Sequence, residues 1–391
     1  MSYRYVVLGS GRQGVALAFD LAKNCEAGEI TLVDSDETAA ITGATRIATL
    51  LPNVRCRVEP VRCDMTDHAR LRDLLRGASV VLSAVPYRFN AELTDLAIDA
   101  GAHFNDLGGN TDVVRTQLAR HDRARAAGIS IVPDCGLAPG LGNILAAHGV
   151  AQLDQPIEAH VRCGGLPERP VGPLGYKLLF NFQGLINEYS GCGEFLRGGK
   201  RVDVPALTEI EEIEFAAPIG RCEAAITSGG TSTCAESFLG KLQAYDYKTV
   251  RYPGHWAVIR ALFGLRCFDE RVTLRGGKTI EPKSLLRELM EDQLQFPDVF
   301  DITVLRSTVS GMHDGRAKTI VYELIDRHDH ATGFTAMERT TAFPTTLVAH
   351  MQARGLIAAG AQPLETCIPL NTYLEELERH DVRVRVTEAL K

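Results

Sequence analysis

Three glycines near the start of the chain constrain its fold more than any other feature. Gly9, Gly11 and Gly14 form a G-x-G-x-x-G pattern between the apolar run 3–8 and the amphipathic stretch 15–23. In a strand–turn–helix unit, the first glycine permits the tight turn, the second lets a pyrophosphate approach the backbone, and the third lets helix and strand pack closely. The pattern therefore predicts a dinucleotide-binding turn at this point.

An acidic residue after the second strand favours NAD as the dinucleotide. Asp34 lies 20 residues after Gly14, at the end of a second apolar run, 29–33. A carboxylate there accepts hydrogen bonds from the adenosine ribose hydroxyls and repels the additional phosphate of NADP. The alternative is a turn without a cofactor, in which Asp34 only caps the following helix.

The alternation of strands and helices predicts the fold class. Short apolar strands alternate with helices as far as Pro133, which is typical of a doubly wound parallel sheet. We therefore expect an α/β Rossmann domain over residues 1–134. Beyond it, longer segments with scattered glycine and proline predict a second, α+β domain on a mixed sheet over 135–339, for substrate binding and oligomerisation. The helices of 340–391 are expected to return to the first domain.

Composition argues against several classes of protein. The 391 residues suffice for two domains, and 45% hydrophobic with 23% charged residues is typical of a soluble globular chain. A net charge of -7 argues against nucleic acid as a partner, and no apolar run is long enough for a membrane span. The ten cysteines lack metal-site spacing, so we expect reduced thiols and no metal. With no signal-peptide pattern at the N-terminus, we expect a cytoplasmic protein.

Further cofactor contacts are expected where the next parallel strands end, because ligands of such sheets bind outside the carboxyl ends of the strands. Asp64 and Met65 follow the third strand, on the adenine side, although Asp64 could equally cap the next helix. Ala84, Val85 and Pro86 follow the fourth strand, on the nicotinamide side.

Motifs spread along the chain together resemble the saccharopine dehydrogenase-like family. They are VVLGSGRQG, SAVPYRFN (83–90), DLGGN (106–110), GLAPGLGN (136–143), CGGLP (163–167) and PLGYK (173–177). Within that family, three other stretches look most like the lysine 6-dehydrogenases. These are NFQGLINEYSG (181–191), SGGTST (228–233) and RYPGHW (251–256). The resemblance covers nearly the whole chain.

This resemblance implies an activity and a set of contacts. Lysine 6-dehydrogenases use NAD to oxidise the ε-amine of L-lysine to the semialdehyde, with release of ammonia. The resemblance places cofactor contacts at Ser10, Gly11, Arg12, Gln13, Asp34, Ser35, Asp64, Val85, Leu107, Leu137 and Pro139. It places substrate contacts near Gly108, Gly109 and 249–251. The DLGG motif departs from the saccharopine reductases, which usually carry hydroxyl and aromatic residues there, and this argues against a saccharopine-sized substrate.

The chemistry requires a base, because hydride leaves only from the carbon of a neutral amine, and a lysine ammonium has a pKa of about 10.4. Asp106, at the end of the fifth strand, could hold the amine or act as the base, or it could merely cap the helix that begins near residue 111. His255 and Lys177 are further catalytic candidates. A helix-capping or surface histidine and a solvated lysine are the alternatives.

Polar groups of the second domain are candidates for binding an amino acid. Thr231, Ser232 and Thr233 carry hydroxyls that suit an α-carboxylate and an α-ammonium, unless the segment is a plain polar hairpin. Arg251 is a candidate for binding a carboxylate through two hydrogen bonds if it faces the cleft, and Tyr176 is a candidate hydroxyl donor.

Three functions remain open at this point. The first is NAD-dependent oxidative deamination of lysine or a close diamino acid. The second is a saccharopine- or opine-type reductase that joins an amine to a keto acid. The third is an NAD-binding protein without catalysis. We expect an amino acid as the small-molecule partner, and a homodimer or homotetramer.

Overall fold

A seven-stranded parallel sheet forms the first half of the molecule. The computed structural model describes residues 2–390. The strand order is β17-β6-β5-β4-β1-β2-β3, with every neighbouring pair parallel. The strands are β1 (Tyr3–Leu8), β2 (Ala27–Asp34), β3 (Arg57–Arg62), β4 (Val80–Ser83), β5 (His103–Asp106), β6 (Ser130–Val132) and β17 (Gly360–Ala361). This order confirms the predicted Rossmann-type sheet.

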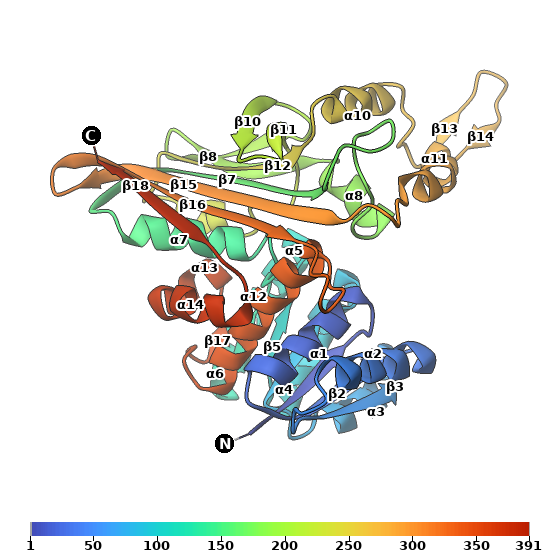
Figure 1. Cartoon of the computed structure of the whole chain (residues 1–391), viewed down its shortest axis with the longest axis vertical. Helices are drawn as coiled ribbons and strands as arrows, with labels where there is room; N and C mark the ends of the chain where they lie inside the picture. The colour runs from blue at the N-terminus through green and yellow to red at the C-terminus, as the bar shows by residue number, and fades with distance from the viewer. Residues whose placement is uncertain (1, 391) are drawn as a thin grey trace.

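Helices flank this sheet on both faces (Figure 1). They are α1 (Arg12–Asn24), α2 (Glu37–Leu50), α3 (His68–Leu75), α4 (Asn90–Ala100), α5 (Thr111–Leu118) and α6 (His121–Ala126), with η1 (Tyr87–Phe89) before α4. The sequence did not predict α2, whose N-terminus is capped by Asp36. None of the helices within residues 2–390 is long and apolar enough to cross a bilayer.

A nine-stranded sheet forms the second half of the molecule. Strand β12 runs parallel to β7, and all other neighbouring strands of this sheet are antiparallel. This arrangement confirms the predicted mixed sheet. The order is β10-β11-β12-β7-β15-β16-β18, with β8 on β12 and β9 on β8. The strands are β7 (Gln155–Pro167), β8 (Cys192–Arg197), β9 (Lys200–Pro205), β10 (Glu211–Phe215), β11 (Gly220–Ile226), β12 (Ala244–Arg251), β15 (Asp301–His313), β16 (Arg316–Arg327) and β18 (Arg385–Leu390).

Most of the remaining helices are short, and α7 lies between the second sheet and the first half (Figure 1). The helices are α7 (Leu141–Ala151), α8 (Phe182–Glu188), α9 (Cys234–Ser237), α10 (His255–Gly264), α11 (Pro282–Glu291), η2 (Asp292–Leu294), α13 (Leu364–Cys367), α14 (Leu370–Leu377) and η3 (Glu378–His380). A separate hairpin pairs β13 (Val272–Thr273) with β14 (Thr279–Ile280).

The C-terminal part of the chain joins both halves. Helix α12 (Ala336–Ala353) packs along α1 and against β4 and β5 of the first sheet. The last strand, β18, instead pairs with β16 and so lies on the second sheet. Residues 340–391 therefore do not all return to the first domain. All six residues of β18 are exposed, so its sequence carries no buried face that would predict a strand.

One apolar core runs through both halves and fixes their relative position. It includes Phe19 of α1, Phe343 of α12, Leu145 of α7 and Leu305 of β15. The rings of Phe19 and Phe343 stack with centroids 6.2 Å apart. Because α12 contributes to this core from the middle, the two sheets share a continuous buried interior.

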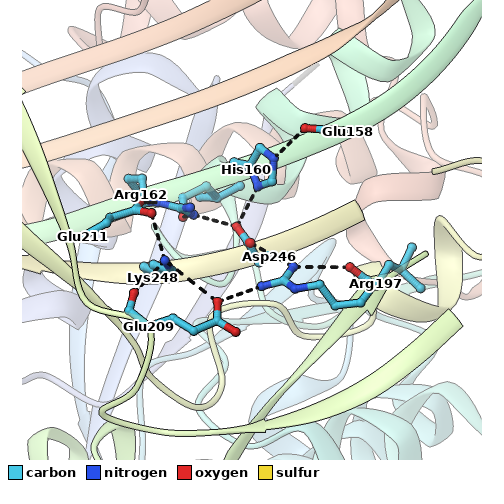
Figure 2. A network of polar contacts seen from close by, with 10 residues as sticks. Glu158, His160, Arg162, Arg197, Glu209, Glu211, Asp246 and Lys248 are labelled. Atoms are coloured by element: carbon cyan, nitrogen blue, oxygen red, sulfur yellow. Dashed lines mark hydrogen bonds and ion pairs between the residues drawn. The ribbon is translucent and has the colours of Figure 1, made fainter. Parts of the chain in front are cut away.

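The face of the second sheet that points away from α7 carries a network of ion pairs around Asp246 (Figure 2). Its carboxylate contacts Nδ1 of His160 at 2.8 Å, Nη1 of Arg162 at 2.7 Å and Nη1 of Arg197 at 2.9 Å. Although burial raises the pKa of Asp246, these contacts hold it well below its ordinary value. The network joins β7, β8 and β12 and leaves Asp246 no free role in catalysis.

A buried carboxylate joins α1 to α12 and to the C-terminal segment. Oδ2 of Asp20 lies 2.6 Å from Nδ1 of His380 and accepts a hydrogen bond from the hydroxyl of Thr346. Burial lowers the pKa of His380, but the Asp20 carboxylate more than offsets this, so the pKa lies above its ordinary value. The charged imidazole is therefore favoured in the folded protein.

Replacing this carboxylate is expected to destabilise the protein in a pH-dependent way. The contribution of a raised histidine pKa is complete below the unfolded value of about 6.5 and is lost as pH rises through the folded value. We expect Asp20→Asn to lower the free energy of unfolding by about 3 kcal/mol at pH 6 and by less at pH 9. Urea unfolding at both pH values checks this. The control is Asp122→Asn, whose side chain is 87% exposed; equal losses at the two pH values would contradict the role of the ion pair.

Candidate functional site

The glycine turn has the geometry of a pyrophosphate cradle. Gly9 has φ +97°, and a Cβ on Gly14 would lie 1.7 Å from the Gly9 carbonyl oxygen, so both positions require glycine. A Cβ on Gly11 would meet no protein atom within 4 Å. Gly11 is also the N-cap of α1 and provides no side-chain cap, so the first N–H groups of the helix are free for an anion.

The surrounding side chains fit a dinucleotide. Buried polar atoms without a partner within residues 2–390 include Oγ of Ser10 and Oε1 of Gln13, both in the turn. A bound cofactor would give such atoms the hydrogen bonds they lack. Ala84 and Val85 border Gly9, with atoms 2.9–3.1 Å from where its Cβ would be, and Pro86 precedes η1. The predicted cofactor residues therefore meet at one edge of the sheet.

Asp34 closes the second strand beside the turn. Its Oδ2 accepts a hydrogen bond from the backbone N–H of Ser10 at 2.6 Å, and its Oδ1 accepts one from Asp36 at 3.0 Å. The segment from Ser35 to residue 45 contains no lysine or arginine. Arg62 of β3 is the basic residue opposite Asp34 in the strand register.

Asp64 and Met65, which follow the third strand, differ in their contacts and burial. Asp64 accepts hydrogen bonds from the backbone N–H and hydroxyl of Thr66, and Asp67, not Asp64, caps α3. Asp64 is exposed, whereas Met65 is buried in the apolar cluster that contains Val33. Both residues remain at the edge where an adenine ring would lie.

Both carboxylate oxygens of Asp106 are engaged in hydrogen bonds with the protein. It is fully buried, and its Oδ1 accepts hydrogen bonds from the backbone N–H groups of Gly108 at 2.8 Å and Asp134 at 3.2 Å. Its Oδ2 accepts one from Gln117 at 2.7 Å. The predicted direct catalytic role is therefore wrong, because every carboxylate oxygen is engaged with the protein. The residue instead holds the loop that follows β5.

The loop after Asp106 forms one wall of the nicotinamide side. Gly108 has φ +82° and Gly109 φ +127°, and a Cβ on Gly109 would lie 3.1 Å from the ring of Tyr87. A Cβ on Gly108 would lie 2.2 Å from Oδ1 of Asp134 and 3.2 Å from Pro139. Leu107 and the buried Leu137 complete this wall, since a Cβ on the glycine before Leu137 would lie 3.0 Å from the Leu107 carbonyl oxygen.

Asp134 is the acid that sequence reasoning missed. It follows β6, has φ 60°, and bonds the hydroxyl of Ser232 through Oδ2, while Oδ1 is buried without a partner. Burial, followed by the nearby Asp106 carboxylate, raises its pKa to about 8. The signal was its position two residues after β6, at the same edge of the parallel sheet as Asp34 and Asp106, which end their strands. Asp134 therefore has a pKa suited to proton transfer near neutral pH, and its Oδ1 accepts no hydrogen bond from another side chain.

The hydroxyl-rich loop of the second domain binds the protein itself. Ser232 contacts Asp134, and Thr233 donates to Glu365 at 2.8 Å. The carbonyl oxygen of Thr231 accepts from Asn143 at 2.9 Å. Of the three predicted substrate contacts, only Ser232 reaches the catalytic edge, through Asp134, because Thr233 is engaged with α13.

Arg251 and His255 lie together in an aromatic cluster. Nε of Arg251 donates to the Tyr189 hydroxyl at 3.1 Å, and its guanidinium lies 4.8 Å from the ring centre of Tyr176. Nε2 of His255 lies 3.0 Å from the Tyr189 hydroxyl, and its Nδ1 lies 3.0 Å from the Leu174 carbonyl oxygen. Burial, followed by the charge of Arg251, lowers the pKa of His255 to about 3. The prediction that His255 exchanges protons near neutral pH is therefore wrong.

Lys177 lies in a cavity that reaches the glycine turn. The cavity has a volume of about 300 Å³, and Arg12, Lys177, Asp301 and Glu338 are among its polar lining residues. Nζ of Lys177 donates to the Val299 carbonyl oxygen at 2.6 Å, and burial lowers its pKa. Lys177 thus faces the cofactor turn from the second domain and can attract anionic groups there.

A substitution at Gly11 can test cofactor binding without disturbing the fold. Because its Cβ would meet open space in the protein but would point to the pyrophosphate position, we expect Gly11→Ala to keep its melting temperature within about 2 °C and to weaken NADH binding at least about tenfold. Fluorescence titration and thermal unfolding measure the two effects. Gly264→Ala, also in open space, is the control; unchanged affinity in Gly11→Ala would contradict the cradle.

Models of two domains match the chain one after the other. Residues 5–132 match the NADP-binding domain of saccharopine dehydrogenase, and residues 136–382 match its C-terminal domain. The glycine turn, Asp34 and most of β1 lie in the former match.

Curated relatives are distant in sequence. Carboxynorspermidine synthase of Vibrio cholerae is 21% identical over 373 residues, covering 89% of this chain and 88% of that protein. The L-glutamate-forming, NADP-dependent saccharopine dehydrogenases of Pyricularia oryzae and Schizosaccharomyces pombe are 28% and 24% identical over 37% and 54% of this chain. The matches span 33% and 48% of the lengths of those two proteins.

Among solved structures, apo saccharopine dehydrogenase (L-Glu forming) from Saccharomyces cerevisiae shares the fold. The TM-score is 0.79 at 17% identity, covering 99% of this chain and 100% of that one. With both family domains present in order, the chain belongs to the saccharopine dehydrogenase family and has an N-terminal nicotinamide dinucleotide-binding domain.

Proposed function

We propose that this protein is an NAD-dependent dehydrogenase that oxidises the ε-amine carbon of L-lysine, or of a close diamino acid, to the semialdehyde with release of ammonia. The observation that carries the proposal is the free carboxylate oxygen of Asp134 beside the Gly108 loop, where nicotinamide would lie. A base at that place is what oxidation of an ammonium-bearing carbon needs. The motifs that resemble lysine 6-dehydrogenases support the choice of amine.

Asp134 acts as the base in this proposal. Its carboxylate takes a proton from the ε-ammonium, so that the amine lone pair can assist loss of hydride from the same carbon. The glycine turn would hold NAD, which would supply the hydride acceptor. Water then adds to the imine carbon, and Asp134 returns its proton to the departing ammonia. Lysine, NAD⁺ and water thus give the semialdehyde, ammonium, NADH and one proton.

Other residues position this base and the substrate. Asp106 donates no proton itself, and its hydrogen bonds to the backbone at Gly108 and Asp134 keep the two loops together. Ser232 holds one oxygen of Asp134, while the other lies buried beside Gly108. Arg251, immobile among aromatic rings, is suited to hold the α-carboxylate.

A second candidate is a reductase that joins an amine to a carbonyl compound. It is favoured by the names of the relatives, among which carboxynorspermidine synthase matches along most of both chains. The same base could serve either reaction, since imine reduction is the reverse of amine oxidation. A binding protein without turnover remains the third alternative. The expected homodimer or homotetramer stays a prediction, for which light scattering is the measurement.

Turnover distinguishes these candidates. We expect NADH to form when purified protein meets NAD and L-lysine, with ammonia released in equal amount, as measured by absorbance and an ammonia assay. NADH oxidation only when an amine and a carbonyl compound are both supplied would instead favour the reductase. Cofactor binding without either reaction would contradict both enzymes.

Asp34 is expected to give a preference for NAD. Because a carboxylate repels the additional phosphate of NADP, we expect NADH to bind at least about tenfold more tightly than NADPH. Replacing Asp34→Ser together with Ser35→Arg should reverse the order in a fluorescence titration. Arg62→Ala is the matched control and should leave NADH affinity within twofold. Equal affinities of the unmodified protein for both cofactors would sink the assignment.

Proton transfer by Asp134 predicts a pH profile. Because the base must be ionised and its pKa is about 8, kcat/KM should rise with pH through that value. Asp134→Asn should lower kcat by about 10²- to 10⁴-fold. Asp314→Asn, with its side chain 88% exposed, is the control. A variant at position 134 that retains full activity and the same profile would exclude this residue as the base.

A further inference from the structure

We infer that Glu188 and Arg251 together bind the zwitterionic head of the amino-acid substrate, Glu188 the α-ammonium and Arg251 the α-carboxylate. The inference rests on the proposed function and deepens it. It names Glu188 as a residue that determines specificity for α-amino acids.

Arg251 is held so that one nitrogen faces Glu188. Its Nε donates to Tyr189, its Nη1 donates to the Val250 carbonyl oxygen at 2.9 Å, and its side chain is 3% exposed. Its Nη2 lies 3.6 Å from Oε2 of Glu188, too far for a hydrogen bond. The pair therefore attract each other but leave hydrogen-bonding capacity that a zwitterion would use.

Glu188 is the accessible member of the pair. Its side chain is 32% exposed, against 3% for Arg251, and it closes helix α8. Burial, only partly opposed by Arg251, raises its pKa to about 7. An ammonium group placed against this carboxylate would compensate its loss of solvation and form a charge-assisted hydrogen bond.

Helix α8 ends beside the loop that reaches the base. The backbone N–H of Ser228 donates to the Glu188 carbonyl oxygen at 2.9 Å, and the Ser228 hydroxyl donates to that of Asn187 at 2.9 Å. Four residues further along the same loop, Ser232 contacts Asp134. One short loop thus connects the proposed head site to the base that would act on the ε-amine.

A further buried group points to a ligand at this place. The hydroxyl of Tyr176 is buried without a hydrogen-bond partner, and its ring lies against the guanidinium of Arg251. Buried hydroxyls without a partner are uncommon, and a carboxylate on Arg251 is the kind of acceptor that would supply one.

The charges also match those of the proposed substrate. Lysine carries one carboxylate and two ammonium groups, and the site presents one guanidinium, Arg251, and two carboxylates, Glu188 and Asp134. An amine without an α-ammonium would leave Glu188 uncompensated, which penalises its binding. Discrimination between lysine and its simpler analogues should therefore depend on Glu188.

Three substrates test each half of the head site. L-Lysine carries both head groups, 6-aminohexanoate lacks the α-ammonium, and 1,5-diaminopentane lacks the α-carboxylate. Loss of a charge-assisted hydrogen bond is expected to reduce kcat/KM of Glu188→Gln for L-lysine by about 10- to 100-fold, mainly through KM. The value for 6-aminohexanoate should change less than threefold. Arg251→Gln should instead lower kcat/KM for the two substrates that carry a carboxylate, L-lysine and 6-aminohexanoate. It should affect 1,5-diaminopentane least.

Matched variants and direct binding keep the test decisive. Glu288→Gln removes an exposed carboxylate of α11 and should change none of the three substrates. Glu188→Asp keeps the charge and should recover part of the preference for L-lysine. Calorimetric titration of the NAD-loaded protein with L-lysine and with 6-aminohexanoate measures the same preference without turnover.

Two failures are distinguishable. If the unmodified protein oxidises none of the three compounds but binds L-lysine in a Glu188-dependent way, the proposed reaction falls and the head site stands. If Glu188→Gln lowers activity and binding equally for all substrates, or changes neither, the head site falls while lysine oxidation stands. A protein that neither binds nor oxidises L-lysine overturns both.

Discussion

The contact between Asp134 and Ser232 is the interaction on which the rest of the site depends. Asp134 belongs to the edge of the parallel sheet, and Ser232 belongs to a loop of the second sheet. Both are non-glycine residues with positive φ, 60° and 47°, a conformation that costs of order 1 kcal/mol or more and persists only where its surroundings hold it. Their contact therefore fixes the second domain against the edge at which parallel sheets bind ligands.

Burial assigns different tasks to the titratable groups near this contact. Two carboxyl groups, Asp106 and Asp134, lie close together away from water, so both favour the protonated form more than usual. Asp106 is fully hydrogen-bonded and holds the loops, whereas Asp134 keeps a free oxygen. His255 is held neutral beside Arg251 and supports the aromatic cluster. In the proposed reaction, proton transfer belongs to Asp134 of the first half and substrate orientation to Arg251 of the second.

Local patterns were sufficient to predict the dinucleotide side. The glycine spacing and Asp34 depend on one strand–turn–helix unit, and the structure brings them together as expected. The alternation of strands and helices likewise predicted the parallel sheet. The pattern could not predict β18, which has no buried face, or α2, in which threonines and Gly43 weaken the helical signal.

The substrate side depends on contacts between residues far apart in the sequence. Gln117 hydrogen-bonds to Asp106 and Ser232 to Asp134, and these contacts decide which carboxylate oxygens are engaged. No local sequence pattern connects the members of either pair. His255 begins a helix, as many exposed residues do, but Tyr189 and Trp256 enclose it. Glu188 belongs to no recognisable sequence motif. Only its position beside Arg251 in the folded protein makes it a candidate for substrate binding. Tertiary packing, not residue type, sets the roles here.

In the proposed reaction, hydride leaves the ε-carbon of lysine. The most direct measurement uses L-lysine carrying two deuterium atoms on that carbon, with mass spectrometry of the NADH formed. We expect each NADH to gain one deuterium and the semialdehyde to retain the other. NADH that forms without deuterium, or no NADH at all from labelled or unlabelled lysine, would contradict it.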